Sequence, residues 1–502
     1  MKILLVYPYY PDSFWSFKHA LKFILKKAAV PPLGLITVSA MLPNDWEKKL
    51  IDLNVSQMKA KDIIWADYVF ISAMYIQKES VDRIIVQCKS NNTKIVAGGP
   101  LFTQEYKNYP NIDHFVLNEA EITLPLFLKD LKKGLPKKVY QTDKYADLSL
   151  SPVPDYKLLQ MKKYAFMNLQ ISRGCPFACD FCEITSLLGH KVRMKTTSQI
   201  INELKALYKL KWRSNVAIVD DNFIGNKKEI IAEILPAIKD FMQTHKFPFV
   251  FNIQSSINLA DDKELMAQMV ESGFISAFIG IETPDEVALH ACRKTQNEKR
   301  DLLQSVKKIQ NAGIQVSGGF IVGFDSDRPS IFQRQIDFIQ ESGIVSAMVG
   351  LLNAPKNTRL YERLENENRL TMELTGNNTD STMNFVPKMD YEELLGGYQR
   401  IINNIYATKP YYKRIRQLFS NYQIRYKKQN RITFTIIFGF IKSIFIIGII
   451  NKGRLEYWKL LFWTLFNRPW FFADAITFSV YGYHFRTIYG LQDKKIVQNL
   501  AD

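Results

Sequence analysis

Short apolar runs alternate with longer runs of helical period through the first 140 or so residues of the chain. The strand-like runs lie at 2–7, 68–73, 94–97 and 114–117, and helical runs between and after them lie at 32–42, 81–88 and 124–131. This alternation predicts a doubly wound, Rossmann-like parallel sheet. Ligands of such sheets bind beyond the carboxyl ends of the strands. We therefore expect the binding residues of this part to be Tyr7, Ser72, Ala73, Gly98, Gly99, Asn118 and Glu119.

The alternation resumes near residue 167 and continues to about residue 351, with a polar residue after most strand-like runs. Six such units predict a partial (β/α)6 barrel, a fold that carries its chemistry at the carboxyl ends of the strands. The polar residues at these ends include Asp220, Asp221, Ser255 and Glu282. The alternative for each acidic residue is a helix N-cap, and Asp220 and Asp221 suit that role equally well.

Composition changes suggest where the domains meet. A chain of 502 residues predicts two or three domains. Prolines at 152 and 154 favour an extended linker. We expect a Rossmann-like domain at 1–145, a linker at 146–165, a barrel at 166–360 and a helical region at 361–502.

Three of the five cysteines, Cys175, Cys179 and Cys182, are spaced C-x3-C-x2-C. Three thiolates can hold three irons of a [4Fe–4S] cluster and leave the fourth iron open for a small ligand. The alternative is a zinc site or unrelated thiols, but zinc sites bring a fourth ligand at a suitable spacing. The nearest candidate, His190, follows a glycine and is typical of a loop.

The remaining cysteines, Cys88 and Cys292, lie on helical stretches and are expected to be packing thiols, with a catalytic thiol as the alternative for Cys292. So few cysteines outside one motif exclude a disulfide framework, and the first residues do not form a signal peptide. Both features predict a cytoplasmic protein.

The cysteine motif, with Phe181 before its last cysteine, resembles the signature of the radical S-adenosylmethionine (SAM) superfamily. The resemblance implies that the amino and carboxylate groups of SAM bind the open iron. It also assigns the backbone of Phe181 and the segment around Ile321 to adenine, and Glu282 to the ribose or amino group. Asp220 and Asp221 stand where many members carry Gly-Gly-Glu, so which of them meets SAM stays open. Ser255 joins this set as a strand-end residue.

Segments 31–35, 97–100 and 118–121 resemble the cobalamin-binding domain of B12-dependent radical SAM enzymes. The motif Asp-x-His-x-x-Gly is absent, so no histidine from that motif would ligate cobalt. The dinucleotide fingerprint G-x-G-x-x-G is absent too, which disfavours NAD. His19, in an aromatic-rich loop, is expected at or near the surface, with contact to a corrin or substrate as the alternative.

Segments 14–23 and 220–227 are similar to the hopanoid C-2 methylase group. This resemblance implies methyl transfer from SAM, by way of cobalamin, to an unactivated carbon of a hydrophobic or lipid substrate. It also implies an electron donor such as flavodoxin or ferredoxin. The alternatives are rearrangement or cyclisation without methyl transfer, a non-catalytic membrane-associated iron–sulfur protein and, more weakly, RNA methylthiolation.

The C-terminal part places basic residues beside an apolar run. The formal net charge is +17, and seven lysines and arginines between 413 and 431 meet no acidic residue. The apolar run 432–450 follows, broken by Lys442, and tryptophans come after it. This order predicts contact of 411–475 with an anionic membrane surface, with a buried helix or a true span as alternatives. Nucleic acid is disfavoured because no RNA-binding module accompanies the basic run.

Overall fold

The computed structural model describes residues 1–423 and 434–492. The chain forms two compact units, each made of several segments. The first unit comprises Met1–Pro11, Val30–Pro176 and Glu183–Asp221, and the second comprises Asp12–Ala29, Phe177–Cys182 and Asn222–Asp502. The domain boundaries expected at residues 145, 165 and 360 stay predictions.

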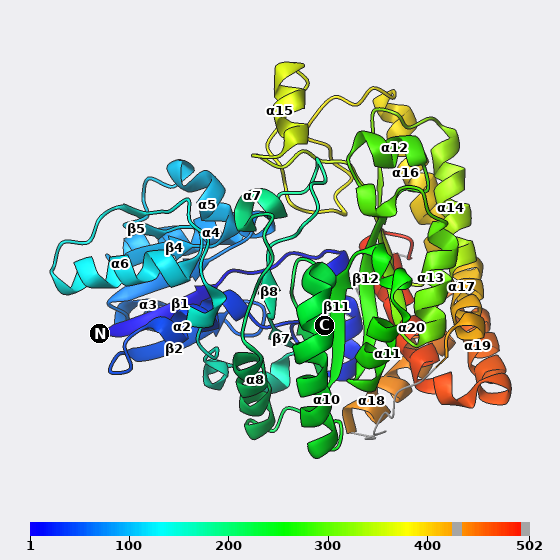
Figure 1. Cartoon of the computed structure of the whole chain (residues 1–502), viewed down its shortest axis with the longest axis horizontal. Coiled ribbons are helices and arrows are strands. Elements are labelled where there is room, and N and C mark those ends of the chain that lie inside the picture. Colours follow the sequence, from blue (N-terminus) through cyan, green and yellow to red (C-terminus); the bar gives the residue numbers. More distant parts are fainter. Residues whose placement is uncertain (424–433, 493–502) are drawn as a thin grey trace. The chain divides into compact units, whose positions relative to one another are not determined.

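A six-stranded sheet forms the centre of the first unit, with strand order β2-β1-β3-β4-β5-β6 and parallel pairing throughout (Figure 1). Its strands are β1 Lys2–Tyr7, β2 Glu47–Asp52, β3 Tyr68–Ser72, β4 Lys94–Gly98, β5 His114–Val116 and β6 Val139–Tyr140. Strand β1 lies inside the sheet, and its side chains Ile3, Leu4, Leu5 and Val6 are fully buried. The predicted doubly wound parallel sheet is confirmed.

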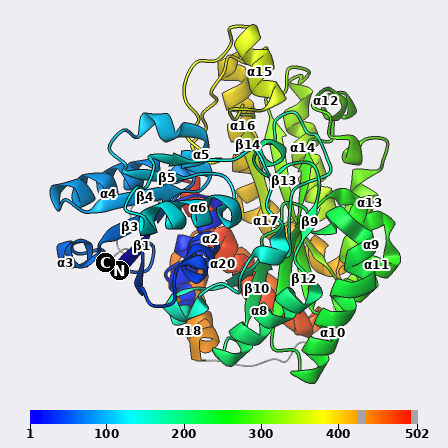
Figure 2. The same cartoon turned by 60° about the vertical axis from the view of Figure 1, so that its left-hand side comes forward.

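Helices cover both faces of this sheet, as the two views show (Figures 1 and 2). One core contains residues from α3 Ala60–Trp65, α4 Lys78–Ser90 and α5 Pro100–Glu105. The other core contains residues from α2 Leu33–Met41 and α6 Ala120–Lys132. Because β1, β3 and β4 contribute alternate side chains to the two cores, their sequences read as continuous apolar runs.

A second parallel sheet has six strands in the order β14-β13-β12-β11-β10-β7, which confirms the partial barrel. The strands are β7 Met167–Leu169, β10 Asn215–Ile218, β11 Val250–Ser255, β12 Phe274–Glu282, β13 Gln315–Val322 and β14 Ala347–Leu351. The connecting helices include α8 Thr197–Lys209, α10 Leu235–Thr244, α11 Lys263–Glu271, α13 Leu302–Ala312 and α14 Ser330–Ser342.

The first strand of this sheet, where the alternation resumes near residue 167, is short. It ends at Leu169, and the chain then forms a small antiparallel pair between β8 Ser172–Arg173 and β9 Arg193–Met194. The cause is Asp220, whose carboxylate accepts the backbone N–H groups of Ile171 and Ser172. These donors are therefore unavailable to β10, the strand beside β7.

The C-terminal part is helical, as expected, with α16 Tyr391–Tyr406, α17 Thr408–Asn421, α18 Phe434–Ser443, α19 Arg454–Asn467 and α20 Phe472–Ile488. Helix α18 continues as the π-helix η12 Ile444–Ile450. Within 1–423 and 434–492, no helix has the length and apolar character needed to cross a membrane. Arg414 of the basic run is fully buried and donates to the carbonyls of Ile405 and Val345. Four other residues of that run lie outside the described residues: Arg425, Lys427, Lys428 and Arg431.

Candidate active site

The cysteine loop is held by backbone hydrogen bonds within each unit. In the first unit, the N–H of Cys175 donates to the carbonyl of Gly189 (3.2 Å). In the second unit, the N–H of Asp180 donates to the carbonyl of Cys292, and the N–H of Leu360 donates to the carbonyl of Asp180 (both 3.0 Å). These bonds connect the cysteine loop to the backbone at Gly189, Cys292 and Leu360.

The donors in the loop fit an iron–sulfur cluster. All three cysteines of the motif are partly accessible. Among the described residues, no three His, Cys, Asp or Glu side chains converge as a single metal ion would require. A [4Fe–4S] cluster does not require that convergence, because each thiolate holds a different iron. Gln296 Nε2 donates to the sulfur of Cys179 (3.6 Å), the kind of contact that tunes the potential of a cluster.

Glu282 ends β12 and pairs with a buried lysine of the second unit. Its Oε1 lies 2.6 Å from Nζ of Lys294, and both side chains are about nine-tenths buried. Burial alone would lower the pKa of Lys294, but Glu282 and the thiolates of Cys179 and Cys182 outweigh it and raise that pKa. The Lys294 ammonium group therefore stays protonated beside the strand-end carboxylate, and the charges of Cys179 and Cys182 act on it as well.

The backbone around Glu282 is adapted to this pair. Glu282 has a positive φ of 63°, and the register of β12 shifts between Gly280 and Glu282. A Cβ atom on Gly280 would lie 2.3 Å from Oε1 of Glu282 and 2.8 Å from Nζ of Lys294. Asn297 Nδ2 donates to the carbonyls of Gly280 and Ile281 and supports the strained end of the strand.

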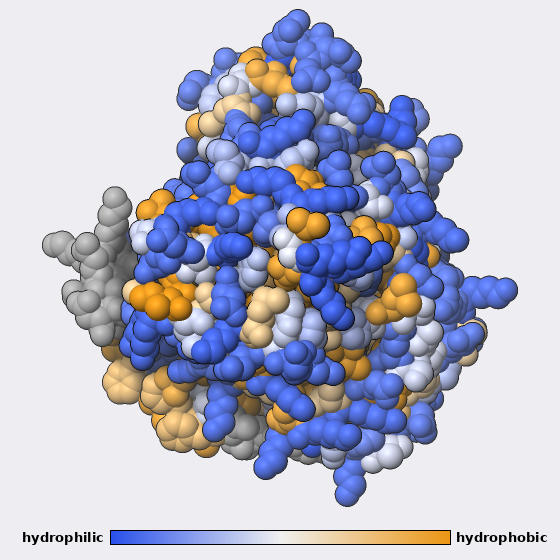
Figure 3. Space-filling view, turned by 90° about the vertical axis from the view of Figure 1, so that its left-hand side faces the viewer, coloured by the Kyte–Doolittle hydropathy of each residue, from blue (hydrophilic) through white to orange (hydrophobic). Residues whose placement is uncertain are grey.

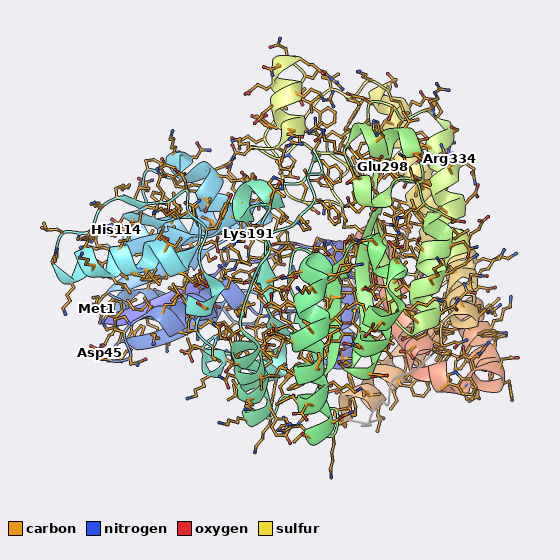
Figure 4. All side chains as sticks on the ribbon, in the orientation of Figure 1. Met1, Asp45, His114, Lys191, Glu298 and Arg334 are labelled. Carbon is orange, nitrogen blue, oxygen red and sulfur yellow. The ribbon has the colours of Figure 1, made fainter. Side chains whose placement is uncertain are left out.

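Further side chains tie neighbouring elements to this strand end. Gln335 of α14 donates to the carbonyls of Glu282 (3.3 Å) and Ile321 (2.8 Å), so it connects the ends of β12 and β13. Arg334, labelled in Figure 4, donates to Asp285 and to the carbonyl of Pro284, at the start of helix α12 Glu286–Ala291.

Phe181 lies within the second unit against the end of β13. Its ring makes an edge contact with Phe324 at 6.1 Å, and Nζ of Lys294 lies 5.9 Å from its centre. Ile321 is partly accessible in β13. Asp327 accepts the N–H groups of Gly323 and Phe324, and burial raises its pKa to about 7. Phe181, Glu282 and Ile321 thus come from elements that these contacts join.

Asp220 is fully buried in the first unit. Besides the two backbone amides, it accepts the Ser172 hydroxyl at 2.7 Å. Burial raises its pKa to about 7, although these hydrogen bonds lower it. Its oxygens are engaged by the protein itself, so its present contacts support the chain just before the cysteines.

Asp221 occupies a similar position one residue later. It accepts the N–H of Gly174 (2.9 Å), and burial raises its pKa. Gly174 has φ +94°, and a Cβ there would lie 2.7 Å from the carbonyl of Lys191. Lys191, labelled in Figure 4, lies just before β9. Asp221 thus holds the turn that leads into Cys175.

Glu119 is engaged in an ion-pair cluster of the first unit. Its Oε2 lies 2.8 Å from both Arg173 and Arg193, and Arg173 also pairs with Glu121. The cluster fixes the residues that flank the cysteine loop in the sequence.

Ser255 lies at the carboxyl end of β11 in the second unit. It is buried, and its hydroxyl donates to the carbonyl of Ser256 (3.3 Å). Ser256 in turn contacts Asn222 through its backbone N–H and its hydroxyl. Among the described residues, no hydrogen bond joins the Ser255 side chain to Phe181, Glu282 or Ile321.

Four of the residues predicted for cobalamin come together at the carboxyl edge of the first sheet. A Cβ on Gly99, which has φ +90°, would lie 2.7 Å from Oγ of Ser72 and 3.2 Å from the backbone of Ala73. A Cβ on Gly98 would lie 2.6 Å from the carbonyl of Val116. The glycines allow this close backbone approach, and Ser72, Ala73, Gly98 and Gly99 form one continuous edge.

Two other predicted residues flank this edge. Asn118, with φ +61°, follows β5, and its N–H donates to Thr103. Tyr7 ends β1, and burial raises its pKa. Tyr9 and Met74 keep 41% and 39% of their surfaces exposed in the loops after β1 and β3. Exposed apolar side chains beside a bare backbone edge fit a large, flat ligand such as a corrin.

The first unit contains two histidines, His114 and His190, and His114 does not lie at this carboxyl edge of the sheet. His114, labelled in Figure 4, begins β5 and so lies at the opposite edge, with Nδ1 2.7 Å from the carbonyl of Lys137. His190 is exposed in the segment after α7 Ile184–Leu188. His19 belongs to the second unit and pairs with Asp12 at 3.0 Å.

The two cysteines outside the motif are buried, as expected for thiols that contribute to packing. Cys88 and Cys292 are buried, and burial raises the pKa of each to about 12. Neither thiol would be ionised near neutral pH, so neither is activated as a nucleophile.

Sequence reasoning missed Lys294, Gln296 and Arg173. Arg173 lies within the cysteine segment, and its position two residues before Cys175 was the available signal. Lys294 follows a helix after Glu282, and no local pattern indicates that it returns to the strand end. Gln296 has no local signal either.

Three parts of the chain match known protein families, and the whole chain is similar to an uncharacterized methyltransferase. Residues 169–339 match the Radical SAM superfamily, residues 27–128 match the B12 binding domain, and residues 358–497 match a domain of unknown function, DUF4070. The chain is 36% identical to an uncharacterized methyltransferase of Synechocystis sp., over 100% of this chain and 94% of that protein.

Two further proteins are similar. The hopanoid C-2 methylase of Rhodopseudomonas palustris is 34% identical over 81% of this chain and 80% of its own length. The radical SAM methyltransferase TsrM of Kitasatospora setae, solved with cobalamin and a [4Fe–4S] cluster, has a similar fold: TM-score 0.58 and 12% identity over 73% of this chain and 78% of that chain.

These findings confirm the expected cofactors, which are a [4Fe–4S] cluster, SAM and cobalamin. They also confirm that the protein is an enzyme that needs a reductant. The chain belongs to the family of B12-binding radical SAM methyltransferases.

Proposed function

We propose that this methyltransferase adds a methyl group to an unactivated carbon of an apolar, hopanoid-like lipid. The observation that carries the proposal is an apolar wall formed by Trp15, Phe278 and Met348 in the second unit. The 34% identity to a hopanoid C-2 methylase over most of both chains supports the same substrate class.

The wall lies on the accessible face of β12. Along this strand Ala277, Ile279 and Ile281 are buried, whereas Phe278 and Gly280 on the opposite face are partly accessible. Trp15 meets Phe278 edge-on at 5.0 Å and donates Nε1–H to the sulfur of Met348.

Glycines shape the wall further. Gly280 pairs with Gly319, which in turn pairs with Met348, so one cross-strand row carries two residues without side chains. A Cβ on Gly319 would lie 2.8 Å from the Phe278 ring, so glycine lets that ring lie over β13. A wall of aromatic and thioether groups suits a hydrocarbon ring system. The charged pair of Glu282 and Lys294 lies over Gly280, beside this wall.

Each predicted site residue has a proposed task. The cysteines hold the cluster, and Phe181, Ile321, Ser255 and Glu282 form the side on which SAM binds, with Lys294 orienting the Glu282 carboxylate. Asp220 and Asp221 hold the turn before Cys175. Tyr7, Ser72, Ala73, Gly98, Gly99, Asn118 and Glu119 form or support the cobalamin edge. When bound, the cluster with SAM supplies radical initiation and cobalamin supplies the methyl carrier.

The proposed substrate also suggests where the enzyme works and what serves it. Electrons would come from a flavodoxin or ferredoxin, because this chemistry begins with a strong one-electron reduction. A hopanoid-like lipid resides in membranes, so we place the enzyme at the inner face of the cytoplasmic membrane, in peripheral contact.

The test is anaerobic turnover of the reconstituted enzyme with methyl-labelled SAM and a detergent-solubilised pentacyclic lipid. We expect labelled lipid with a mass gain of one methylene. Phe278→Ala and Trp15→Ala should lower methyl transfer at least tenfold while leaving SAM cleavage without lipid unchanged. An altered lipid without label would favour rearrangement, and equal methylation by both variants would remove the wall from substrate binding.

A further inference from the structure

Helices α18 and α19, with η12 between them, present large apolar side chains to solvent. Phe434 is 74% exposed and Phe466 is 80% exposed. Together with Trp470 of the short helix η13 Pro469–Phe471, these side chains form a set that we call the apolar face: Phe434, Ile436, Ile437, Ile441, Phe445, Ile449, Ile450, Leu455, Phe462, Leu465, Phe466 and Trp470. Scattered apolar side chains are ordinary on a protein surface, but so many within 37 successive residues are not.

The apolar face follows the helical period, so it is not a by-product of loose packing. Phe434, Ile437, Ile441, Phe445 and Ile449 recur every three or four residues along α18 and η12. The opposite side is packed: Gly439 and Ser443 are buried, and the Ser443 hydroxyl lies 2.8 Å from the hydroxyl of Tyr457. Among the described residues, α18 and η12 thus carry an exposed apolar side opposite the packed one.

Helix α19 repeats this arrangement. Tyr457, Leu460, Leu461 and Thr464 are buried, whereas Leu455, Phe462 and Phe466 are exposed. Trp458 donates Nε1–H to the carbonyl of Gly448, which ties α19 to η12. The two exposed stripes therefore belong to one joined structure.

Charge identifies what covers the apolar face. Residues 424–470 contain nine lysines and arginines and one acidic residue, Glu456. Glu456 pairs with Lys459 at 2.8 Å, so it offers little attraction to a cationic partner. Apolar side chains within a sequence segment of such basic excess fit the interface of an anionic bilayer. A protein partner would need an acidic rim around an apolar centre, and a second copy would place basic rims against each other.

We propose that the apolar face inserts into the interfacial layer of an anionic membrane, and that this is the role of the domain of unknown function at 358–497. The helices would lie in the plane of the surface. Figure 3 draws one side of the molecule, on which apolar side chains are scattered among hydrophilic ones except at the lower left, where they gather.

The proposed membrane contact adjoins the proposed substrate wall. Gly439 of α18 packs on the carbonyl of Phe23, and Lys442 donates to the carbonyl of Lys22. The same segment, 12–29, carries Trp15. One continuous segment of the second unit thus connects the membrane-facing helix with the wall. The link to substrate uptake rests on the proposed function, whereas membrane docking does not.

The test is flotation of the full-length protein with vesicles of phosphatidylcholine containing 30% phosphatidylglycerol, at physiological salt. We expect wild type to float and Phe462→Glu/Phe466→Glu to lose at least tenfold in vesicle partitioning. A second variant, Phe434→Glu/Ile441→Glu, should behave alike. The matched control is Ile64→Glu/Leu135→Glu, which places the same charges on side chains 67% and 76% exposed in the first unit and should float like wild type.

Other outcomes would overturn the proposal. Docking through the apolar face is excluded if wild type does not float, or if the apolar-face variants and the control variant lose vesicle partitioning equally. If wild type dimerises without binding vesicles, and the apolar-face variants abolish the dimer, the apolar face is assigned to a second copy of the chain. Because flotation needs neither lipid substrate nor reductant, a failure of docking is separate from a failure of methyl transfer on detergent-solubilised lipid.

Discussion

Two acidic residues at strand ends, Asp220 after β10 and Glu282 at the end of β12, have different surroundings. Asp220 accepts three hydrogen bonds from Ile171 and Ser172 and is fully buried. Glu282 has a left-handed backbone and one close partner, Lys294, beside the cysteine loop. Acidic residues at the same kind of position thus have different contacts.

The two carboxylates differ in how much hydrogen-bonding capacity remains free for a ligand. The hydrogen bonds of Asp220 are used by the chain, so its contribution is to position the segment before Cys175. Glu282 shares one oxygen with Lys294, and its strained backbone is maintained by Gly280, Asn297 and Gln335. Strain held by surrounding contacts at a strand end is typical of a functional site.

The largest effect is expected from Glu282→Gln. We expect at least a hundredfold loss of SAM cleavage, about 2.7 kcal/mol of transition-state stabilisation, because the carboxylate is proposed to hold SAM. Iron content and unfolding midpoint should stay near wild type. The measurement is 5′-deoxyadenosine formation under strong reduction, and cleavage at the wild-type rate would contradict the assignment.

Gly280→Ala tests the same site without touching a charge. Its new Cβ would collide with the Glu282–Lys294 pair, so we expect SAM binding to weaken roughly tenfold or more, in line with ~1–3 kcal/mol for forced repacking. Gly396→Ala is the matched control, because no atom lies within 4 Å of the Cβ position on this α16 glycine. Equal behaviour of the two variants would show that the pair need not keep its geometry.

Asp220→Asn should act on stability rather than directly on SAM. The amide cannot accept all three hydrogen bonds, and an unsatisfied buried donor costs about 1–3 kcal/mol. Denaturant unfolding should show this loss of stability. A smaller loss is expected for Asp221→Asn, because the native Asp221 accepts only one backbone hydrogen bond, from Gly174, among the described residues. An unchanged midpoint in Asp220→Asn together with lost SAM binding would reverse the two roles.

A pH dependence of stability is expected as well. The pKa of Asp220 is about 7 in the folded protein and 3.8 in the unfolded chain, so between these values the folded state holds the extra proton. Its contribution is fully present below pH 3.8 and is lost as the pH rises through 7, by about 1.4 kcal/mol per unit at most.

Asp327 has a raised pKa as well, so the quantity to measure is the difference between wild type and Asp220→Asn. We expect the wild-type advantage in unfolding free energy to grow from pH 7 to pH 5. An advantage that shrinks over this range would mean that the three donors, rather than burial, control the ionisation of Asp220.

Both sheets could be predicted from the sequence because each strand is a short apolar run between turn residues. The cysteine motif and Glu282 could be found for the same reason, since their signals are local. Lys294 could not, because its meeting with Glu282 depends on how α12 and the turn after it fold back. The ion pair of Glu119 with Arg173 joins residues 54 apart. Trp15 is a third case, since its segment belongs to the second unit although it follows β1.

The most direct test of the account is a single turnover with methyl-labelled SAM, reductant and a lipid extract from membranes, measured for labelled lipid and 5′-deoxyadenosine together. We predict labelled methyl on a lipid carbon, one 5′-deoxyadenosine for each methyl transferred, and loss of both in Cys179→Ala. Formation of 5′-deoxyadenosine with every lipid left unlabelled, in protein loaded with iron and cobalamin, would contradict a lipid methyltransferase.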